Sequence, residues 1–358
     1  MNAPTKTTGP TAPTSDTPVV SPGARRLGLS RGLALRGVVI AAVVLAAGMA
    51  VPYIVLDRFY ISMLFDGLVL ALLALSVGFL ARHLGLISLG HTAFYGGAAY
   101  LVGISVTQWG WSPLMAALTG LVGGTVLALV MALLVVRSSG MGFLMLTLAL
   151  GQALYQLSIQ RVAIPYTGAF DGLQISFDAD ATFLGLSVAQ MMNGALFWPV
   201  VWTALVLSAL GLWLVGRSRF GTVLEGIREN EERMRFSGFN TYWPRVLAFT
   251  ISGAVASVGG VLFALNAAYV SPDVLSFLKA GDALIAAIVG GLGVLLGPIL
   301  GALLYIVAQS QFNQSGNLYL YTGLALILVL MFLPGGILGS ISSIRKRLAR
   351  RSAKENSP

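Results

Sequence analysis

The sequence predicts an all-α polytopic membrane protein with about 8–10 transmembrane helices, each roughly 20 residues long. Apolar residues make up 56% of the 358 residues, and charged residues only 10%. Nine apolar segments approach the length that a helix needs to cross a hydrocarbon core of about 30 Å. Strands of a membrane barrel would alternate in hydrophobicity over about ten residues, and the sequence shows no such alternation. Helices are expected because they satisfy their own backbone hydrogen bonds in lipid.

The chain begins with a polar segment and continues as a series of apolar ones. Residues 1–30 are rich in Pro, Thr, Ser and Ala without apolar periodicity, so we expect a disordered cytoplasmic tail. The first apolar segment, 37–56, is too long and begins too late for a signal peptide, so we expect it to remain as a span. The other expected spans are 60–81, 86–107, 113–136, 141–160, 194–215, 245–269, 283–309 and 318–338. They form one transmembrane domain over 37–338.

The orientation of the spans follows from Lys and Arg, which favour the cytoplasmic side of short loops. With the N-terminal tail inside, successive crossings return Arg82, Arg137 and the 216–245 loop to the cytoplasm. The same crossings leave the 161–193 loop outside, in the periplasm. This loop carries Asp171, Asp178 and Asp180 and is a candidate contact for a delivery protein, or simply a solvated cap.

Segment 283–309 is expected to be a broken or re-entrant helix. A single crossing there would place the basic C-terminal tail, 343–358, outside the cell. Two short crossings, or a return to the same side, keep both termini cytoplasmic. Every Lys and Arg then lies inside except Arg58, Arg161 and Lys279. The glycines expected to interrupt the helix are Gly290, Gly291 and Gly293.

Composition and motifs exclude several functions. The chain contains no Cys, so disulfides, thiolate metal sites and thiol catalysis are absent. It contains no G-x-x-x-x-G-K-[ST] motif for nucleotide phosphates and no H-E-x-x-H pair. The two histidines have no second ligand at metal spacing, so we expect no metal site and no directly bound cofactor. The net charge is +9, but the basic residues lie beside the apolar spans, where they favour contact with anionic lipid over nucleic acid.

Small polar and glycine residues near the spans are candidates for a solute pathway. The segment 85–97 combines glycines with Ser88 and His91, and broken helices are tolerated where they line a cavity or are buried in protein. Two alternatives stay open. Gly293, Gly297 and Gly301 also have the spacing of close helix packing, and His91 is preferentially a structural residue bonded to a backbone carbonyl. The pathway candidates are Ser88, Gly90, His91, Thr147, Gln152, Gly290, Gly291 and Gly293.

Charge within the spans is scarce. Only Asp66 lies clearly inside a span, and Asp282 lies at the edge of another. Ion-coupled carriers usually need ionisable side chains in their spans to bind the driving ion. The scarcity favours energy supplied by another protein. The alternative is a stand-alone ion-coupled secondary transporter in which Asp66 or Asp282 binds a proton or cation.

The loop 216–245 is the most charged part of the chain, with six Arg and four Glu. Phe220, Val223, Leu224 and Ile227 recur at the spacing of an amphipathic helix, and Gly238 is a candidate left-handed cap at its end. Helices that lie on lipid usually have a cationic polar face, whereas this one carries both signs of charge. The mixture favours docking of a cytoplasmic protein.

Five segments give the chain a family resemblance. They are G-L-I-S-L-G-H-T-A-F-Y-G-G-A-A-Y at 85–100, F-L-M-L-T-L-A-L-G-Q at 143–152, Y-T-G-A-F-D-G-L at 166–173, S-R-F-G-T-V-L-E-G-I-R-E-N-E at 218–231, and G-G-L-G-V-L-L-G-P-I-L-G-A at 290–302. The chain resembles the LivM-type permease subunits of ABC importers for branched-chain amino acids, over most of 60–338. Ala169 and Phe170 depart from the family pattern, so the solute stays open.

The resemblance implies a permease of the bacterial inner membrane rather than an enzyme. Its partners would be two cytoplasmic ATPase subunits, a second LivH-like permease and a periplasmic solute-binding protein, with ATP acting only through the ATPases. It further implies that loop 216–245 is the coupling segment on which the ATPase acts. The residues carried over as coupling residues are Arg219, Phe220, Gly221, Glu225, Ile227, Arg228, Glu229, Asn230 and Gly238.

Overall fold

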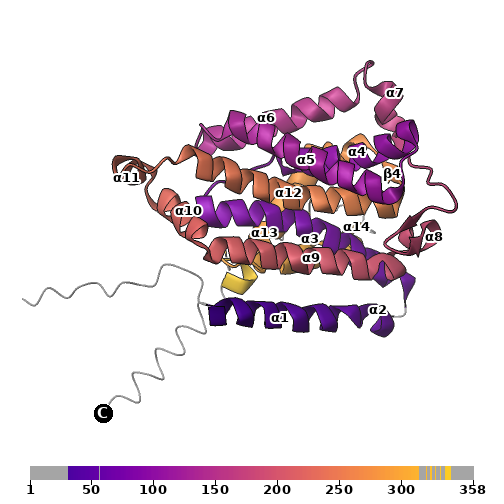
Figure 1. Ribbon diagram of the computed structural model, residues 1–358, viewed down its shortest axis with the longest axis horizontal. Coiled ribbons are helices and arrows are strands. Elements are labelled where there is room, and N and C mark those ends of the chain that lie inside the picture. Colours follow the sequence, from indigo (N-terminus) through magenta and orange to yellow (C-terminus); the bar gives the residue numbers. More distant parts are fainter. Residues whose placement is uncertain are drawn as a thin grey trace, which may run out of the picture.

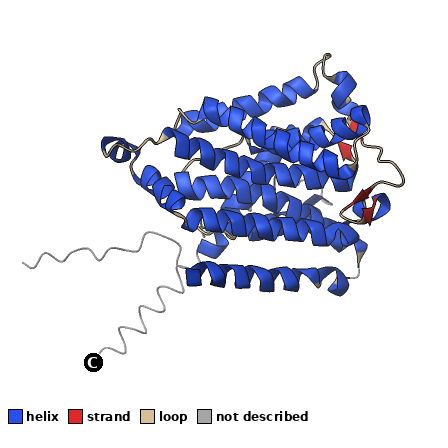
Figure 2. Cartoon of the chain, in the orientation of Figure 1, coloured by secondary structure: helices blue, strands red, loops and turns tan. Residues whose placement is uncertain are grey.

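Long helices that run side by side make up the described chain (Figures 1 and 2). The structure is a computed structural model that describes residues 31–55, 57–313, 320, 323–324, 327, 331 and 335–339. The two tails expected at 1–30 and 343–358 lie outside the described residues, as does most of the expected span 318–338. The all-α class that the sequence predicts is confirmed.

The helices have the following bounds in chain order: α1 Arg31–Met49, α2 Val51–Ile54, α3 Arg58–Leu84, α4 His91–Trp109, α5 Pro113–Val135, α6 Gly140–Ser158, α7 Ile164–Thr167, η1 Ala169–Asp171, α8 Val188–Met191, α9 Gly194–Arg217, α10 Arg219–Glu229, α11 Glu231–Phe236, α12 Tyr242–Ala267, η2 Pro272–Leu275, α13 Phe277–Gly290 and α14 Gly297–Asn313. Short helices occur mainly at the two ends of the bundle (Figure 1).

The described part of the chain also contains four two-residue strands. β1 Leu173–Gln174 pairs antiparallel with β4 Tyr269–Val270, and β2 Thr182–Phe183 pairs with β3 Leu186–Ser187. The strands lie with α7 and α8 at one end of the bundle, and α10 and α11 lie at the opposite end (Figure 1). The two loops that the sequence predicts on opposite sides of a membrane are therefore at opposite ends of the molecule.

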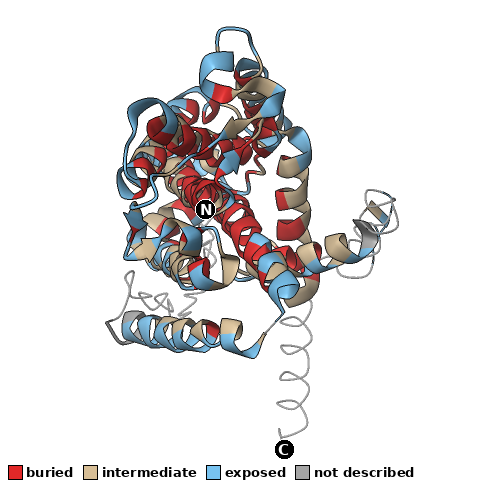
Figure 3. Ribbon diagram, turned by 90° about the vertical axis from the view of Figure 1, so that its right-hand side faces the viewer, coloured by how far each residue is buried: buried red, intermediate tan, exposed pale blue. Residues whose placement is uncertain are grey.

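Six helical segments in the described part of the chain are long and apolar enough to cross a membrane: Leu35–Ile54, Arg58–Leu84, Pro113–Val135, Gly140–Ser158, Gly194–Arg217 and Tyr242–Ala267. Of these, α3 and α12 are the most buried. Buried residues gather in the middle of the bundle (Figure 3). The outer helices expose large apolar side chains such as Val122, Met145 and Leu207. Exposed apolar surface of this extent suits contact with lipid.

The expected span 86–107 begins later than its hydropathy suggests. α3 ends in a left-handed cap at Gly85, which has a φ of 68°. Residues up to 90 are non-helical, and α4 begins only at His91. The residues between the end of α3 and His91 are therefore non-helical, and the chain enters the bundle before α4 begins. Apolar content alone cannot reveal such a non-helical entry.

The expected break in 283–309 is confirmed. α13 ends at Gly290, Gly291 follows with a φ of 107°, and α14 begins at Gly297. α13 has 14 residues and is about 21 Å long at about 1.5 Å per residue, which is shorter than a hydrocarbon core.

The glycines around this break also pack two helices together. A Cβ on Gly301 would lie 1.9 Å from the Ala286 carbonyl oxygen, and one on Gly290 would lie 1.8 Å from the Gly297 carbonyl oxygen. Only glycines permit backbones to approach so closely. Gly293 does not belong to this contact, since nothing lies within 4 Å of its Cβ position. The packing set is Gly290, Gly297 and Gly301 rather than the regular ladder that the sequence predicts.

Candidate functional site

The amphipathic helix expected in loop 216–245 exists, but as two helices rather than one. The Ser218 hydroxyl accepts a hydrogen bond from the Gly221 amide at 3.4 Å and begins α10. Asn230 ends α10, and its side-chain oxygen accepts from the Arg233 amide at 2.8 Å to begin α11. Asn230 favours an N-cap because a short polar side chain satisfies a free amide there. A single residue thus sets the angle between the two helices.

One face of α10 packs on α3 and α9. Leu224 is completely buried and Ile227 nearly so. A Cβ on Gly221 would lie 2.2 Å from the Gly216 carbonyl oxygen, so α10 approaches the end of α9 closely. Phe220 packs half-buried against the same core. Three of the expected coupling residues, Phe220, Gly221 and Ile227, therefore contact this chain's own membrane helices rather than open surface.

Arg228 also points back to the bundle. Its guanidinium donates a hydrogen bond to the Arg82 carbonyl oxygen in the last turn of α3. Carbonyls in the last turn of a helix have no partner within the helix and attract cations. Arg228 therefore ties α10 to the end of α3, although part of its side chain is exposed.

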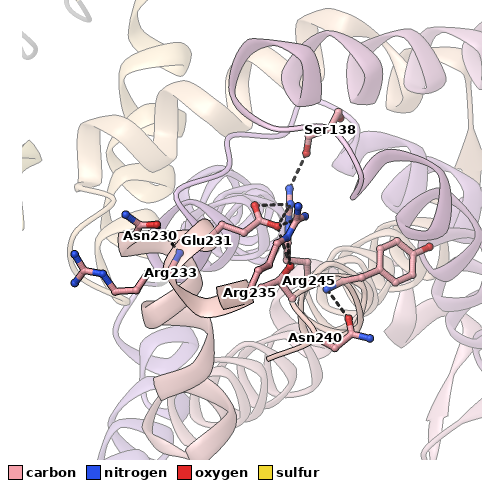
Figure 4. Close-up of polar contacts among 9 residues, drawn as sticks. Ser138, Asn230, Glu231, Arg233, Arg235, Asn240 and Arg245 are labelled. Carbon is pink, nitrogen blue, oxygen red and sulfur yellow. Dashed lines mark hydrogen bonds and ion pairs between the residues drawn. The ribbon is translucent and has the colours of Figure 1, made fainter. Parts of the chain in front are cut away.

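The second attachment is a network centred on Glu231, which joins α11 to α12 (Figure 4). The Glu231 carboxylate lies 3.0 Å from Arg245 and 2.8 Å from Arg235, and accepts a hydrogen bond from the Thr241 hydroxyl at 2.9 Å. Arg245 also donates to the Ser138 carbonyl oxygen at 2.6 Å, in the turn between α5 and α6. We call these five residues the Glu231 network. It joins α11, α12 and that turn.

The sequence analysis missed the Glu231 network. Arg245 is 4% exposed and lies just inside the expected span 245–269. A buried arginine at the start of a span needs an anionic partner, and this signal was available. Its partner was not, because four Glu residues in the loop were equally plausible from spacing alone.

The environment of Glu231 favours its charged form. Partial burial raises the pKa of this carboxyl, but the Thr241 hydrogen bond and the Arg245 and Arg235 guanidiniums outweigh that effect. Its pKa is therefore below the ordinary value of a glutamate. Glu231 is ionised at neutral pH, and the network is charge-complementary there.

The outward face of the α10–α11 segment is polar with an apolar centre. Phe236 is 91% exposed, and Phe239 and Trp243 are more than half exposed. Charged side chains of both signs surround them and are likewise exposed: Arg219, Glu225, Glu229, Glu232 and Arg233. Gly238 has a φ of 82°, which confirms the expected left-handed residue after the helix. An aromatic centre within a polar rim is typical of protein docking surfaces.

The expected pathway residues Ser88, Gly90 and Thr147 meet where α6 crosses the start of α4. The Ser88 hydroxyl accepts from the Gly90 amide at 3.2 Å, and the Thr147 hydroxyl accepts from the Leu89 amide at 3.4 Å. A Cβ on Gly90 would lie 2.8 Å from the Thr147 carbonyl oxygen. Ser88 and Thr147 are fully buried, and Gln152 lies further along α6, half-buried.

His91 joins three helices. Its Nε2 lies 2.8 Å from the Ser252 hydroxyl, which donates to the Ser76 carbonyl oxygen at 2.6 Å. Nε2 must therefore carry the proton and donate to Ser252. The expected partner of His91 was wrong: it is a side-chain hydroxyl of α12 rather than a backbone carbonyl. The Nδ1 atom is buried without a partner in the described part of the chain.

A crevice too narrow to admit a water molecule brings Ser88 and His91 against α3 and α13. Its lining also includes Leu73, Val77, Ala280 and Ala283. Gly290, Gly291 and Gly293 do not line it, so the structure does not bring the two groups of expected pathway residues together. Among the described residues there is no group of three or more His, Asp or Glu side chains placed to hold a metal.

Comparisons with known proteins agree with this architecture. The family model described as branched-chain amino acid transport system, permease component, matches residues 59–334. The chain is 30% identical to the high-affinity branched-chain amino acid transport system permease protein LivM of Escherichia coli K12 over 277 residues, 71% of this chain and 64% of that protein.

Two shorter matches are also informative. LivH, a permease protein of the same transport system in Escherichia coli K12, is 31% identical over 144 residues, which is 39% of this chain and 46% of LivH. The autoinducer 2 import system permease protein LsrC of Klebsiella pneumoniae is 34% identical over 110 residues, 29% of this chain and 32% of LsrC. The matched part thus spans just under two thirds of LivM. No solved structure gives a significant match.

Proposed function

The chain belongs to the family of branched-chain amino acid transport permease components, and from this premise we propose that it is the membrane subunit of an ABC importer. It moves branched-chain amino acids, or a related small polar solute, across the inner membrane with both termini cytoplasmic. It contains no nucleotide-binding motif. ATP therefore acts through two cytoplasmic ATPase subunits.

The observation that carries this proposal is the α10–α11 segment. Its inner face is attached to the bundle through buried Leu224 and Ile227, the Arg228 bond to α3 and the Glu231 network. Its outer face exposes an aromatic side chain, Phe236, among charges of both signs. The inner face is bonded to the bundle and the outer face is exposed. A subunit docked on the outer face could therefore pass its movement on to the membrane helices.

The attachments determine where a displacement would go. α10 contacts α3 and α9, while the Glu231 network contacts α12 and the α5–α6 turn. α3 and α12 are the central helices of the bundle. Closure of the ATPases against α11 would therefore move the two most buried long helices of the bundle. Of the expected coupling residues, Arg219, Glu225 and Glu229 are exposed and are proposed as ATPase contacts. Arg228 instead bonds to the end of α3.

The remaining partners follow from similarity and from the opposite end of the molecule. Sequence similarity to LivH suggests that a second, related permease packs beside this one as a pseudo-symmetric pair. At the end away from α10 and α11, the 161–193 loop is held by the β1–β4 pair and exposes Asp171, Asp178 and Asp180. We propose this loop as the contact for a periplasmic solute-binding protein.

Substitution of Phe236 tests the docking proposal. In the complete complex, Phe236→Ala should weaken ATPase binding about tenfold or more, since burial of a phenylalanine contributes about 1.5–3 kcal/mol. Glu229→Lys should reduce solute-stimulated ATP hydrolysis because it reverses a charge on the docking face. The assays are co-purification of the ATPase and ATP hydrolysis in proteoliposomes.

The matched control is Phe170→Ala, which removes another highly exposed phenylalanine, at the opposite end of the bundle. It should leave ATPase binding in detergent unchanged. Equal ATPase binding by the Phe236 and Phe170 variants would contradict docking on α11. Reversal of Arg228 is a poor test, because this side chain bonds to α3 and its loss would disturb the permease itself.

A further inference from the structure

A second polar cluster is formed by residues of α3, α13 and α14, away from α10 and α11. It consists of Asp66 on α3, Lys279 and Asp282 on α13, and Tyr305 on α14. The Tyr305 hydroxyl donates to the Asp282 carboxylate. Lys279 and Asp282 are three residues apart and so lie on the same face of α13. Lys279 is close enough to interact electrostatically with both Asp66 and Asp282. We call these four residues the Asp66 cluster.

The Asp66 cluster is at membrane depth. Asp66 lies eight residues into α3, about 12 Å from the end of the helix at about 1.5 Å per residue. The neighbouring Gly67 packs against Leu303 and Ile306 of α14. Lys279, which the positive-inside argument placed in an external loop, is instead in the first turn of α13. Charged side chains at such depth face a wet cavity or another protein rather than lipid.

The charges of the cluster are incompletely matched. Among the described residues, the close ion pairs all involve Glu231, and neither Asp66 nor Lys279 has one. Asp66 is exposed, and Lys279 and Asp282 are half-buried, so all three can be reached by a small molecule. Two carboxylates with one ammonium leave an excess negative charge beside a cation.

A buried hydroxyl that interacts with Asp66 is also without a hydrogen-bond partner among the described residues. The Tyr95 hydroxyl on α4 is buried and has no hydrogen-bond partner among the described residues. Tyr95 also interacts electrostatically with Asp66. A buried hydroxyl without a partner costs free energy unless water or a ligand bonds to it.

We infer that the Asp66 cluster binds the zwitterionic head group of an amino acid during its passage through the permease. Asp66 and Asp282 receive the ammonium group, and Lys279 receives the carboxylate. A proton or metal cation would be served by the carboxylates alone, whereas a zwitterion requires both signs of charge within one site. This inference rests on the proposed function and adds the site within the permease that recognises the solute class.

Binding to the permease itself tests the inference. The purified complex of both permeases and the ATPases, without the binding protein, is titrated with radiolabelled leucine in a scintillation proximity assay. Leucinamide, which lacks the carboxylate, and 4-methylpentanoate, which lacks the ammonium group, serve as competitors. Unlabelled leucine should bind roughly tenfold or more tightly than either competitor, because each competitor loses about one charge-assisted hydrogen bond.

The variants assign the charges. Lys279→Gln should abolish the preference for leucine over leucinamide, and Asp66→Asn should abolish the preference over 4-methylpentanoate. Asp57→Asn is the matched control on the same helix, because Asn caps a helix as well as Asp does. It should keep both preferences. Retention of both preferences by Lys279→Gln and Asp66→Asn would overturn the inference.

Accessibility separates the site from a buried contact with the second permease. Because the chain has no Cys, Asp66→Cys introduces the single thiol of this subunit. In the assembled complex this thiol should react with a charged, membrane-impermeant thiol reagent, and leucine should slow the reaction. Val122→Cys, exposed on the apolar face of α5, should not react. An unreactive Asp66→Cys, or dissociation of the complex by Asp66→Asn, would show that the second permease covers the cluster and would overturn the inference.

Failure of the inference is distinguishable from failure of the proposed function. ATP-dependent leucine uptake by the wild-type complex with its binding protein tests the proposed function alone. If uptake is present and the complex without the binding protein does not bind leucine, only the Asp66 cluster assignment is wrong. If uptake of leucine is absent, the solute class of the proposed function is wrong.

Discussion

Replacing Glu231 with Gln removes the carboxylate that attaches α11 to α12. The Arg245 guanidinium, 4% exposed, would then keep only the Ser138 carbonyl as a strong partner. Removal of one partner from a buried ion pair costs about 3–5 kcal/mol. Glu231 is 26% exposed, so water partly screens its interactions. We therefore expect the lower end, about 3 kcal/mol.

This free energy should appear as local opening of α11. α11 has only six residues and would be marginal without its attachments. The Met234 amide bonds to the Asn230 carbonyl, and the Ser237 amide bonds to the Arg233 carbonyl. Loss of about 3 kcal/mol should make these amides exchange with solvent roughly 100-fold faster. Hydrogen–deuterium exchange with mass spectrometry measures this directly on the complex.

Glu232→Gln is the matched control, because Glu232 is adjacent and exposed, and no bond of its side chain holds α11 to α12. It should leave exchange in α11 unchanged. In proteoliposomes, Glu231→Gln should also reduce uptake per ATP hydrolysed while membrane insertion stays normal. Equal exchange rates in the two variants would refute the reasoning that the Glu231 network holds α11 to the bundle.

Three further predictions follow from other contacts. Because the pKa of Glu231 is depressed, the stability that its charge contributes is fully present above the ordinary value of 4.5 and is lost as pH falls through the lower folded-state value. Hydrogen exchange in α11, corrected for intrinsic rates, should therefore be constant from neutral pH to about 5 and rise below 4.5. A rise already near pH 7 would contradict this. Gly301→Ala places a methyl group against the Ala286 carbonyl and should lower the free energy of unfolding by about 1–3 kcal/mol or more. The thermal midpoint, measured by tryptophan fluorescence, should fall accordingly. Gly281→Ala, with open space at its Cβ position, should leave the midpoint unchanged. Ser252→Ala leaves the Nε2 of His91 without its partner and should lower the free energy of unfolding by about 1–3 kcal/mol. The control Ser257→Ala, on the same helix, removes a hydroxyl that bonds to the Gly253 carbonyl and should lower it less. Equal thermal midpoints of the two variants would contradict this prediction.

Features set by local sequence were the ones that could be predicted. Helical spans follow from apolar length, and the left-handed residue Gly238 and the break near Gly290 follow from the conformational freedom of glycine. The amphipathic pattern of Phe220, Leu224 and Ile227 correctly indicated a helix with one buried face. These properties depend on residues a few positions apart, which a sequence shows directly.

Features set by tertiary contacts could not be predicted. Arg228 and Glu229 are adjacent and equally charged in magnitude, yet Arg228 turns to an α3 carbonyl and Glu229 stays exposed. Glu231 and Arg245 are 14 positions apart, and the Ser138 carbonyl is more than a hundred positions away. Lys279 was expected in a loop because the positive-inside rule describes loops, whereas it lies in the first turn of α13.

The most direct test of the importer interpretation is uptake in proteoliposomes of defined composition. Liposomes with this chain, the second permease and both ATPases, supplied with the binding protein and ATP, should accumulate leucine. Omission of ATP should abolish accumulation, and Phe236→Ala should reduce it. The chain alone should accumulate none under a proton or sodium gradient. Uphill uptake by the chain alone, driven by an ion gradient without ATP, would contradict the interpretation.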